Sequence, residues 1–289
     1  FTTDASFPMT IAPLETGIVN IAFNNSALGP VEDEMVMGSD DLPAGLSVGL
    51  SATGVDGNVL SGNLSGTYAA ATYRISGDLT IADGDTAHLQ AGTTFLFDGE
   101  YNFNIYGTLK AIGTETDSIV FDNYGDDRWR GFTLDNASDE TTFEYVRLSG
   151  AQKDSGGGMS VTGSNPTLTH VIIAGNTAFT AGGMRLLSSS PTLTHVIISG
   201  NTADYGGGMY AISSSPTLTH VIITGNTANS FSGGMYIVYS NPTLTHVTIA
   251  GNTASIGGGM YLYSSNPTLT NSIVWNNSPE SISIDNTSF

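Results

Sequence analysis

Four histidines recur at almost equal intervals in the second half of the chain, and imidazole is the commonest side-chain ligand of metal ions. They are His170, His195, His220 and His246. A metal site needs several ligands that converge on one point, usually with carboxylate support, but no acidic residue recurs beside these histidines. On stacked strands, successive members would stand roughly 4.8 Å apart. We therefore predict a structural column in which each histidine ends a strand and stacks on its neighbours, and no metal site.

Asparagines recur with the same spacing. They are Asn176, Asn201, Asn226, Asn252 and Asn277. Stacked side-chain amides can hydrogen-bond from one strand layer to the next at a turn, which satisfies polar groups that would otherwise be buried alone. We predict that these residues form a structural ladder and do not bind a ligand.

A third column combines aromatic residues with a cation. Tyr210, Tyr236 and Tyr261 follow Arg185 at the repeat interval, and a second column two residues further on is mostly apolar. The predicted interaction face, called the tyrosine face below, consists of Arg185, Tyr210, Ile212, Tyr236, Val238, Tyr261 and Tyr263. Contiguous apolar surface usually marks an interaction site. Contact with another protein or copy is the preferred interpretation; stacking on carbohydrate and plain packing between repeats are the alternatives.

Paired threonines form a regular pattern of hydroxyl and methyl groups. The motif Thr-x-Thr occurs at Thr167/Thr169, Thr192/Thr194, Thr217/Thr219, Thr243/Thr245 and Thr268/Thr270. This grid resembles the ice-binding face of β-helical antifreeze proteins. Threonine is also simply a favourable residue on the exposed side of a strand, and that interpretation remains open.

These columns belong to an internal repeat that must position them. Methionines mark the repeat with steps of 25, 25, 26 and 25 residues, and they are Met159, Met184, Met209, Met235 and Met260. Residues after each methionine alternate with period two, as in a strand with one buried face. Met209 and Ala211 belong to the inward columns, and Tyr210 to a variable outward one. The single extra residue lies between Gly225 and Gly233, which indicates a turn.

The repeat resembles a known family. Gly-Gly-Met followed by Ile-x-Gly-Asn-Thr-Ala, as at Ile173 to Asn176, is similar to the repeat of polymorphic outer-membrane-protein type found in bacterial surface proteins. That resemblance implies a right-handed parallel β-helix of the pectate-lyase-like superfold. We therefore predict an all-β fold, a right-handed parallel β-helix with three short strands per coil of about 25 residues. The regular coils span residues 156–278, and looser coils begin near residue 67.

The beginning of the chain does not repeat. Residues 1–66 contain four of the prolines and the acidic run Glu32-Asp33-Glu34. We predict a small N-terminal β module here, either sandwich-like or a cap, followed by the β-helix over residues 67–289.

Charge is distributed unevenly along the chain. The formal net charge is −19, with 26 acidic and 7 basic residues. Residues 1–154 hold 23 of the acidic and 6 of the basic residues, whereas residues 155–289 hold 3 and 1. Such a chain cannot neutralise a polyanion, which disfavours nucleic acid and anionic membranes as partners. No apolar run is long enough for membrane insertion.

An enzyme of the lyase type would need a basic residue near the substrate and often Asp-bound Ca²⁺. The best constellation is Asp126, Asp127, Arg128 and Arg130 around Trp129. Adjacent residues point to opposite faces of a strand, and the negative net charge repels an acidic polysaccharide. We predict no catalytic residues and no cofactor, with acidic turns such as Asp83-Gly84-Asp85 as the remaining positions for Ca²⁺.

The predicted function is non-catalytic. We expect an extracellular or cell-surface structural or adhesive protein that associates with itself or with other surface proteins, in its most concrete form as a filament subunit. A polysaccharide-binding or polysaccharide-lyase protein is the alternative, and ice binding through the Thr-x-Thr rows is the third interpretation.

Overall fold

The computed structural model describes residues 2–3, 21–22, 29–39, 42–54 and 58–285, and among them it contains strands and turns but no helix. The chain divides into two compact units, Phe1–Asn58 and Val59–Phe289. In the first unit, β1 (Thr2–Thr3) pairs with β2 (Ile21–Ala22), and β3 (Gly29–Ser39) pairs with β4 (Leu42–Gly54), both antiparallel. The paired residues described in the N-terminal unit are thus in β-strands, and the sandwich-like or cap arrangement stays a prediction.

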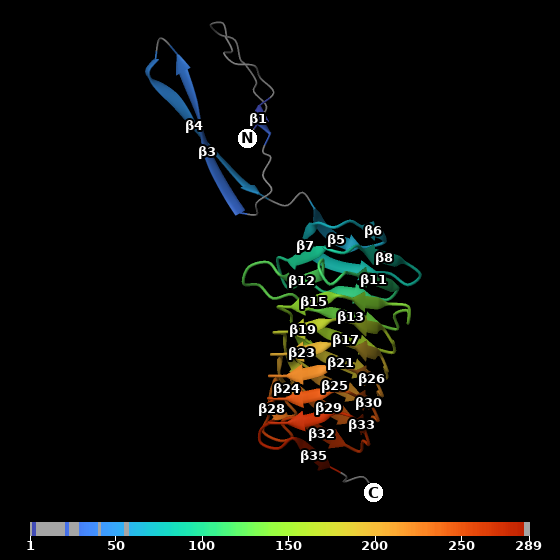
Figure 1. Ribbon diagram of the computed structural model, residues 1–289. Coiled ribbons are helices and arrows are strands. Elements are labelled where there is room, and N and C mark those ends of the chain that lie inside the picture. Colours follow the sequence, from blue (N-terminus) through green and yellow to red (C-terminus); the bar gives the residue numbers. More distant parts are fainter. Residues whose placement is uncertain (1, 4–20, 23–28, 40–41, 55–57, 286–289) are drawn as a thin grey trace. The chain divides into compact units, whose positions relative to one another are not determined.

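The second unit is a right-handed parallel β-solenoid of about 9 turns, visible as a ladder of strands in Figure 1. Each coil contributes one strand to each of three parallel stacks around a common core. This arrangement confirms the predicted fold class. It also satisfies the backbone, because almost every strand pairs on both sides with the equivalent strand of the neighbouring coils.

The first stack carries the Met-x-x-x strands of the repeat. Its members are β5 (Val59–Asn63), β7 (Thr72–Ile81), β10 (Phe103–Ile105), β13 (Phe132–Asp135), β17 (Met159–Thr162), β21 (Met184–Leu187), β25 (Met209–Ile212), β29 (Met235–Val238), β32 (Met260–Tyr263) and β35 (Ile282–Asp285).

The second stack carries the Thr-Leu-Thr strands. Its members are β6 (Gly66–Tyr68), β8 (Thr86–Leu89), β11 (Thr108–Ile112), β14 (Thr142–Glu144), β18 (Thr167–Thr169), β22 (Thr192–Thr194), β26 (Thr217–Thr219), β30 (Thr243–Thr245) and β33 (Thr268–Thr270).

The third stack begins at Val59 and Leu60 of β5, which pair with the N-terminal half of β7, and that half of β7 pairs in turn with β9. Its further members are β9 (Thr94–Phe97), β12 (Ile119–Asn123), β15 (Val146–Ser149), β19 (Ile172–Ala174), β23 (Ile197–Ser199), β27 (Ile222–Thr224), β31 (Thr248–Ala250) and β34 (Ile273–Trp275).

The solenoid begins earlier than the sequence indicated. The predicted boundary lies after residue 66, but β5 already pairs with β7 and β6 with β8, so the solenoid starts at Val59. Gly62 and Gly66 have positive φ, +82° and +76°. They interrupt the alternation of inward and outward residues that would have identified these strands.

A fourth, shorter sheet was not predicted. We call it the side sheet, and it consists of β16 (Gln152–Ser155), β20 (Thr177–Thr180), β24 (Thr202–Tyr205) and β28 (Thr227–Phe231). It lies between the third strand of one coil and the Gly-Gly-Met turn of the next. The one-residue insertion falls here, because Ala203 pairs with Ala228 whereas Tyr205 pairs with Phe231. A bulge in an outer strand thus absorbs the insertion without shifting the core columns.

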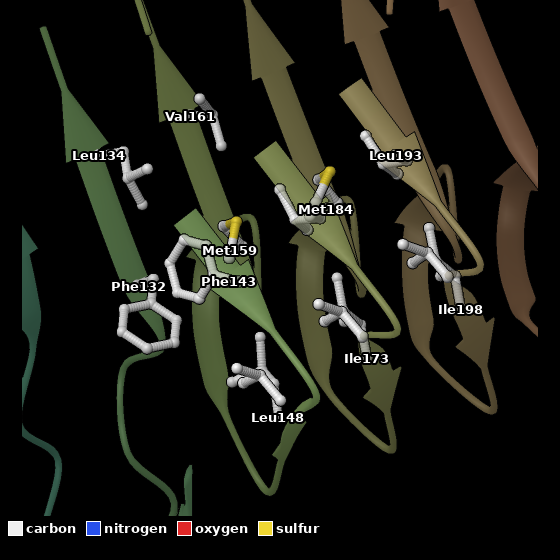
Figure 2. Close-up of a cluster of buried hydrophobic side chains, with 14 of the residues drawn as sticks. Phe132, Leu134, Phe143, Leu148, Met159, Val161, Ile173, Met184, Leu193 and Ile198 are labelled. Carbon is white, nitrogen blue, oxygen red and sulfur yellow. The ribbon is translucent and has the colours of Figure 1, made fainter. Parts of the chain in front are cut away.

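The core is a set of inward columns that run from coil to coil. Leu148, Ile173 and Ile198 lie in one row in Figure 2, and all are at most 1% exposed. In the early coils the columns are aromatic: Phe97 and Trp129 stack with ring centroids 4.1 Å apart. Full burial of one such side chain contributes about 1.5–3 kcal/mol. Stability of the solenoid therefore comes mainly from coil-on-coil packing rather than from any single coil.

Candidate functional site

The tyrosine face lies on the outward side of the first stack. Tyr210, Tyr236 and Tyr261 are register partners on β25, β29 and β32. The rings of Tyr210 and Tyr236 are nearly parallel, with centroids 4.5 Å apart, whereas Tyr261 meets Tyr236 edge-on at 5.2 Å. The two stacked rings cover each other's faces, so their edges and hydroxyl groups are what an outside partner would meet.

Aromatic residues of the side sheet pack onto this face. The ring of Phe231 lies 4.7 Å from that of Tyr261, and the ring of Tyr205 lies 6.5 Å from that of Tyr236. Tyr261 is consequently only 8% exposed. Stacking on a sugar needs a free ring face, and the contacts within this cluster already occupy much of the available ring surface.

The members of the tyrosine face differ in exposure. Val238 and Tyr261 are buried, whereas partial exposure is shared by Arg185, Tyr210, Ile212, Tyr236 and Tyr263. Sequence alternation identified all seven as outward. It could not indicate that the unpredicted side sheet and neighbouring rings would cover two of them. Tyr239, which is 58% exposed and meets Tyr263 edge-on at 5.4 Å, extends the aromatic surface beyond the predicted set.

Burial changes the acidity of these phenols. Burial, with a smaller contribution from the neighbouring tyrosines, raises the pKa of Tyr236 from 10.0 to about 12. Burial also raises the pKa of Tyr210, although the positive charge of Arg185 works in the opposite direction. The tyrosine face therefore carries neutral hydroxyl groups at physiological pH.

One functional candidate escaped the sequence analysis. Lys153 lies on β16 of the side sheet, and its ammonium group contacts Oγ1 of Thr133 on β13 of the first stack. Burial lowers the pKa of Lys153, and the positive charges of Arg130 and Arg185 lower it further. The side sheet, which the sequence analysis did not predict, places this lysine beside the outward column that contains Thr133 and Arg185.

The four histidines form a continuous stack on the surface. Successive rings from His170 to His246 are nearly parallel, with centroids 4.8–4.9 Å apart, and Tyr145 continues the stack above His170 at 4.4 Å. All four histidines have φ between +53° and +55°, a left-handed conformation in which Asn and His are enriched. Asn271 occupies the fifth position with φ of +50°. Within residues 58–285, no group of three or more metal-ligating side chains forms a metal site.

The five asparagines form a buried ladder at the turn between the third stack and the side sheet. The backbone N–H and the side-chain Nδ2 of Asn176 both donate to Oδ1 of Asn201, at 3.0 and 3.1 Å. The same pair of bonds repeats down the ladder to Asn277. Every Nδ2 from Asn201 onwards also donates to a buried backbone carbonyl. These amides are occupied by internal bonds, so they are structural.

The threonine rows lie in register on the second stack. Thr167 pairs with Thr192 and Thr169 with Thr194, and the rows continue to β33. The first threonine of each pair is exposed. The second is partly exposed in the four upper coils. The result is a regular surface of hydroxyl and methyl groups.

The residues considered for catalysis do not converge. Trp129 is fully buried, and its indole N–H donates to the carbonyl of Ser149 at 2.8 Å. Arg130 pairs with Glu100, while Arg128 lies 3.4 Å from the carbonyl oxygen of Gly175. The exposed Asp126 and Asp127 belong to the loop that precedes Trp129. The arrangement supplies no set of groups aimed at one reacting atom.

The last described coil exposes part of its inward columns. Leu269, Ile282 and Ile284 occupy inward columns but are 38%, 41% and 60% exposed, because no further coil is described below them. Ile273 and Trp275, on the outer side of the same coil, are 58% and 73% exposed. A cavity of about 540 Å³ opens here; it is lined by Asn241, Met260, Leu262, Ser264, Ser265, Asn266, Pro267, Leu269, Ile282 and Ile284.

The stacked coils, inward columns and asparagine ladder together define a β-helix protein. Residues 110–289 match the family model described as a right handed beta helix region, which is more than half of the chain. The protein therefore belongs to the right-handed β-helix family. No curated protein and no solved structure gives a significant match. Among the described residues, no helix has the length and apolar character needed to cross a membrane.

Proposed function

We propose that this protein is a non-catalytic structural or adhesive β-helix that works at the cell surface or outside the cell and associates through its tyrosine face. The observation that carries the proposal is the row of partly exposed aromatic and apolar side chains on this face, where Tyr210 and Tyr236 stand beside Ile212 and the 58% exposed Tyr239 extends the row. Contiguous exposed apolar surface favours association.

The partner we propose for this face is a second copy of the same chain. Residues 155–289 hold only three acidic residues and one basic residue. The tyrosine face carries a single charge, that of Arg185, so two copies can meet with little like-charge repulsion, and a twofold axis would bring the same patch together on both copies.

The experiment is to compare association of the full chain with that of two single variants. Tyr236→Arg places a charge on the tyrosine face, and Phe179→Lys places one on the side sheet, where the side chain is 57% exposed. We expect sedimentation velocity and negative-stain electron microscopy to show assemblies for the wild type and for Phe179→Lys. Tyr236→Arg should remain monomeric. Equal assembly of all three proteins would overturn the proposal.

Tyr236→Arg is chosen because Arg185 already occupies this column in an earlier coil. Changing Tyr210, Tyr236 and Tyr261 to serine should also weaken association, but the loss of ring packing would reduce stability as well. Unchanged assembly of Tyr236→Arg would exclude a role for the face.

Ice binding is a second candidate function, favoured by the in-register threonine rows on five successive strands. Methyl and hydroxyl groups at regular intervals can order water in a repeating pattern. This function predicts thermal hysteresis that is lost in Thr194→Tyr or Thr219→Tyr. The threonine rows and the tyrosine face lie on different stacks, so the same variants would leave association through the tyrosine face intact and the two functions can be separated.

A further inference from the structure

Two cations approach the same outward column of the first stack. The described residues form three ion pairs, Arg74–Asp98, Lys110–Glu140 and Arg130–Glu100. Within the same residues, neither Lys153 nor Arg185 takes part in an ion pair. Their mutual repulsion and the partial burial of both side chains cost free energy, because a partly dehydrated charge needs a counter-charge.

The fold does not require cations at these two positions. In the coils below, the column of Lys153 holds Ala178, Ala203 and Ala228. The column of Arg185 holds Tyr210 in the next coil. Neutral residues therefore fit the same backbone positions and the same packing in the neighbouring coils. An unfavourable pair of charges at positions where the repeat elsewhere uses Ala and Tyr indicates a ligand rather than a structural need.

The two cations share one corner of the molecule. Lys153 extends from the side sheet to Thr133 on the first stack. Thr133, Ser160 and Arg185 follow one another in the same outward column on β13, β17 and β21. The corner thus combines an ammonium group, a guanidinium group and two hydroxyl side chains. Arg130, the third cation nearby, is already neutralised by Glu100.

We propose that Lys153 and Arg185 form a binding site for a doubly charged tetrahedral oxyanion, a sulfate or phosphate group. Two uncompensated positive charges match a dianion better than a single carboxylate. The planar fork of Arg185 donates two parallel hydrogen bonds to such oxygens, while Lys153 contributes a point charge. Bound anion would restore charge balance in the corner. The site shares Arg185 with the tyrosine face, but binding of the anion does not depend on the proposed association.

The chain offers variants matched to its own repeat. Lys153→Ala and Arg185→Tyr replace each cation by the residue of the same column in the next coil. Arg147→Ile is the control, because it removes one positive charge on the third stack, where Ile172 occupies the same column. All three substitutions introduce a residue that the repeat already accommodates at the same position in the next coil. We therefore expect the fold to stay intact. Circular dichroism and the unfolding midpoint verify this.

The test is isothermal titration calorimetry of the full chain with sodium sulfate, sodium phosphate and sodium acetate, with ionic strength held constant by sodium chloride. We expect saturable binding of sulfate or phosphate to the wild type and to Arg147→Ile. Affinity should fall about tenfold or more in Lys153→Ala and Arg185→Tyr, which corresponds to the loss of one charge-assisted contact. Acetate should bind about tenfold more weakly than the better dianion.

Preference between the two dianions identifies the source of the group, a sulfated or a phosphorylated ligand, and either result supports the site. Absence of saturable dianion binding to the wild type would overturn the proposal. So would equal affinity in the wild type, Lys153→Ala and Arg185→Tyr, since the binding would then lie elsewhere. Because the assay measures anion binding and not assembly, failure of the site and failure of association remain distinguishable.

Discussion

The backbone N–H and the side-chain amide of Asn201 both donate to Oδ1 of Asn226, each at 3.0 Å. Both residues are fully buried, so one oxygen of the lower coil satisfies two donors of the coil above. The same amide of Asn201 also donates to the carbonyl of Ile173. Each asparagine thereby fixes three strand layers relative to one another, which explains why this side chain recurs in every regular coil.

Removing one rung should be costly. Asn201→Ala leaves the backbone N–H and the side-chain amide of Asn176 and the carbonyl of Ile173 without their partner. Each buried unsatisfied group costs about 1–3 kcal/mol. We expect a loss of at least about 3 kcal/mol of unfolding free energy, measured by denaturant titration. Asn229→Ala removes an exposed amide that binds Asp204 and should change stability by less than about 0.5 kcal/mol. Equal effects of the two substitutions would contradict a structural ladder.

Stability should decline at alkaline pH because of the tyrosine face. The pKa of Tyr236 is raised from 10.0 to about 12, so the fold favours the neutral phenol. Its contribution to stability is complete below pH 10.0 and is lost as the pH rises through about 12. Denaturant midpoints measured across this window should fall in the wild type and fall less in Tyr236→Phe. Identical pH profiles for the two proteins would show that this phenol is not held neutral by the fold.

The left-handed turn at the histidine column makes a further prediction. His220 has φ of +54°, and Asn271 adopts φ of +50° at the equivalent position of a later coil. His220→Asn should therefore keep stability within about 0.5 kcal/mol of the wild type. His220→Val places a β-branched residue in a conformation that costs about 1–2 kcal/mol. Unfolding midpoints of the two variants test this prediction. A valine variant as stable as the asparagine variant would contradict a requirement for a residue that tolerates the left-handed conformation.

The repeat made the fold of the regular coils predictable. Period-two alternation around Met209 and Leu218, together with an interval of about 25 residues, leaves few arrangements other than stacked parallel strands. The N-terminal limit of the solenoid was harder to predict. There, Gly62 and Gly66 break the alternation, and pairing with later coils, which is a long-range property, determines that β5 and β6 belong to the solenoid.

The candidate surfaces were only partly predictable, for a related reason. Alternation tells which side of a strand a residue occupies, but not what lies above it. Tyr261 is outward as predicted and yet buried, because Phe231 of the side sheet packs on it. Lys153 gave no signal in the sequence, since its importance depends on the side sheet that carries it towards Thr133. The exposure of Ile284 in the last described strand could also not be predicted, because its sequence alternates in the same way as the buried residues of the earlier coils.

The most direct test of association through the tyrosine face uses the absence of cysteine from the chain. Ile212→Cys places a single thiol on the face at a partly exposed position, and Phe179→Cys places one on the side sheet as the control. We predict that a short bismaleimide cross-linker joins two copies of Ile212→Cys and leaves Phe179→Cys as single chains. Equal cross-linking of the two variants, or no cross-linking of Ile212→Cys, would contradict the account.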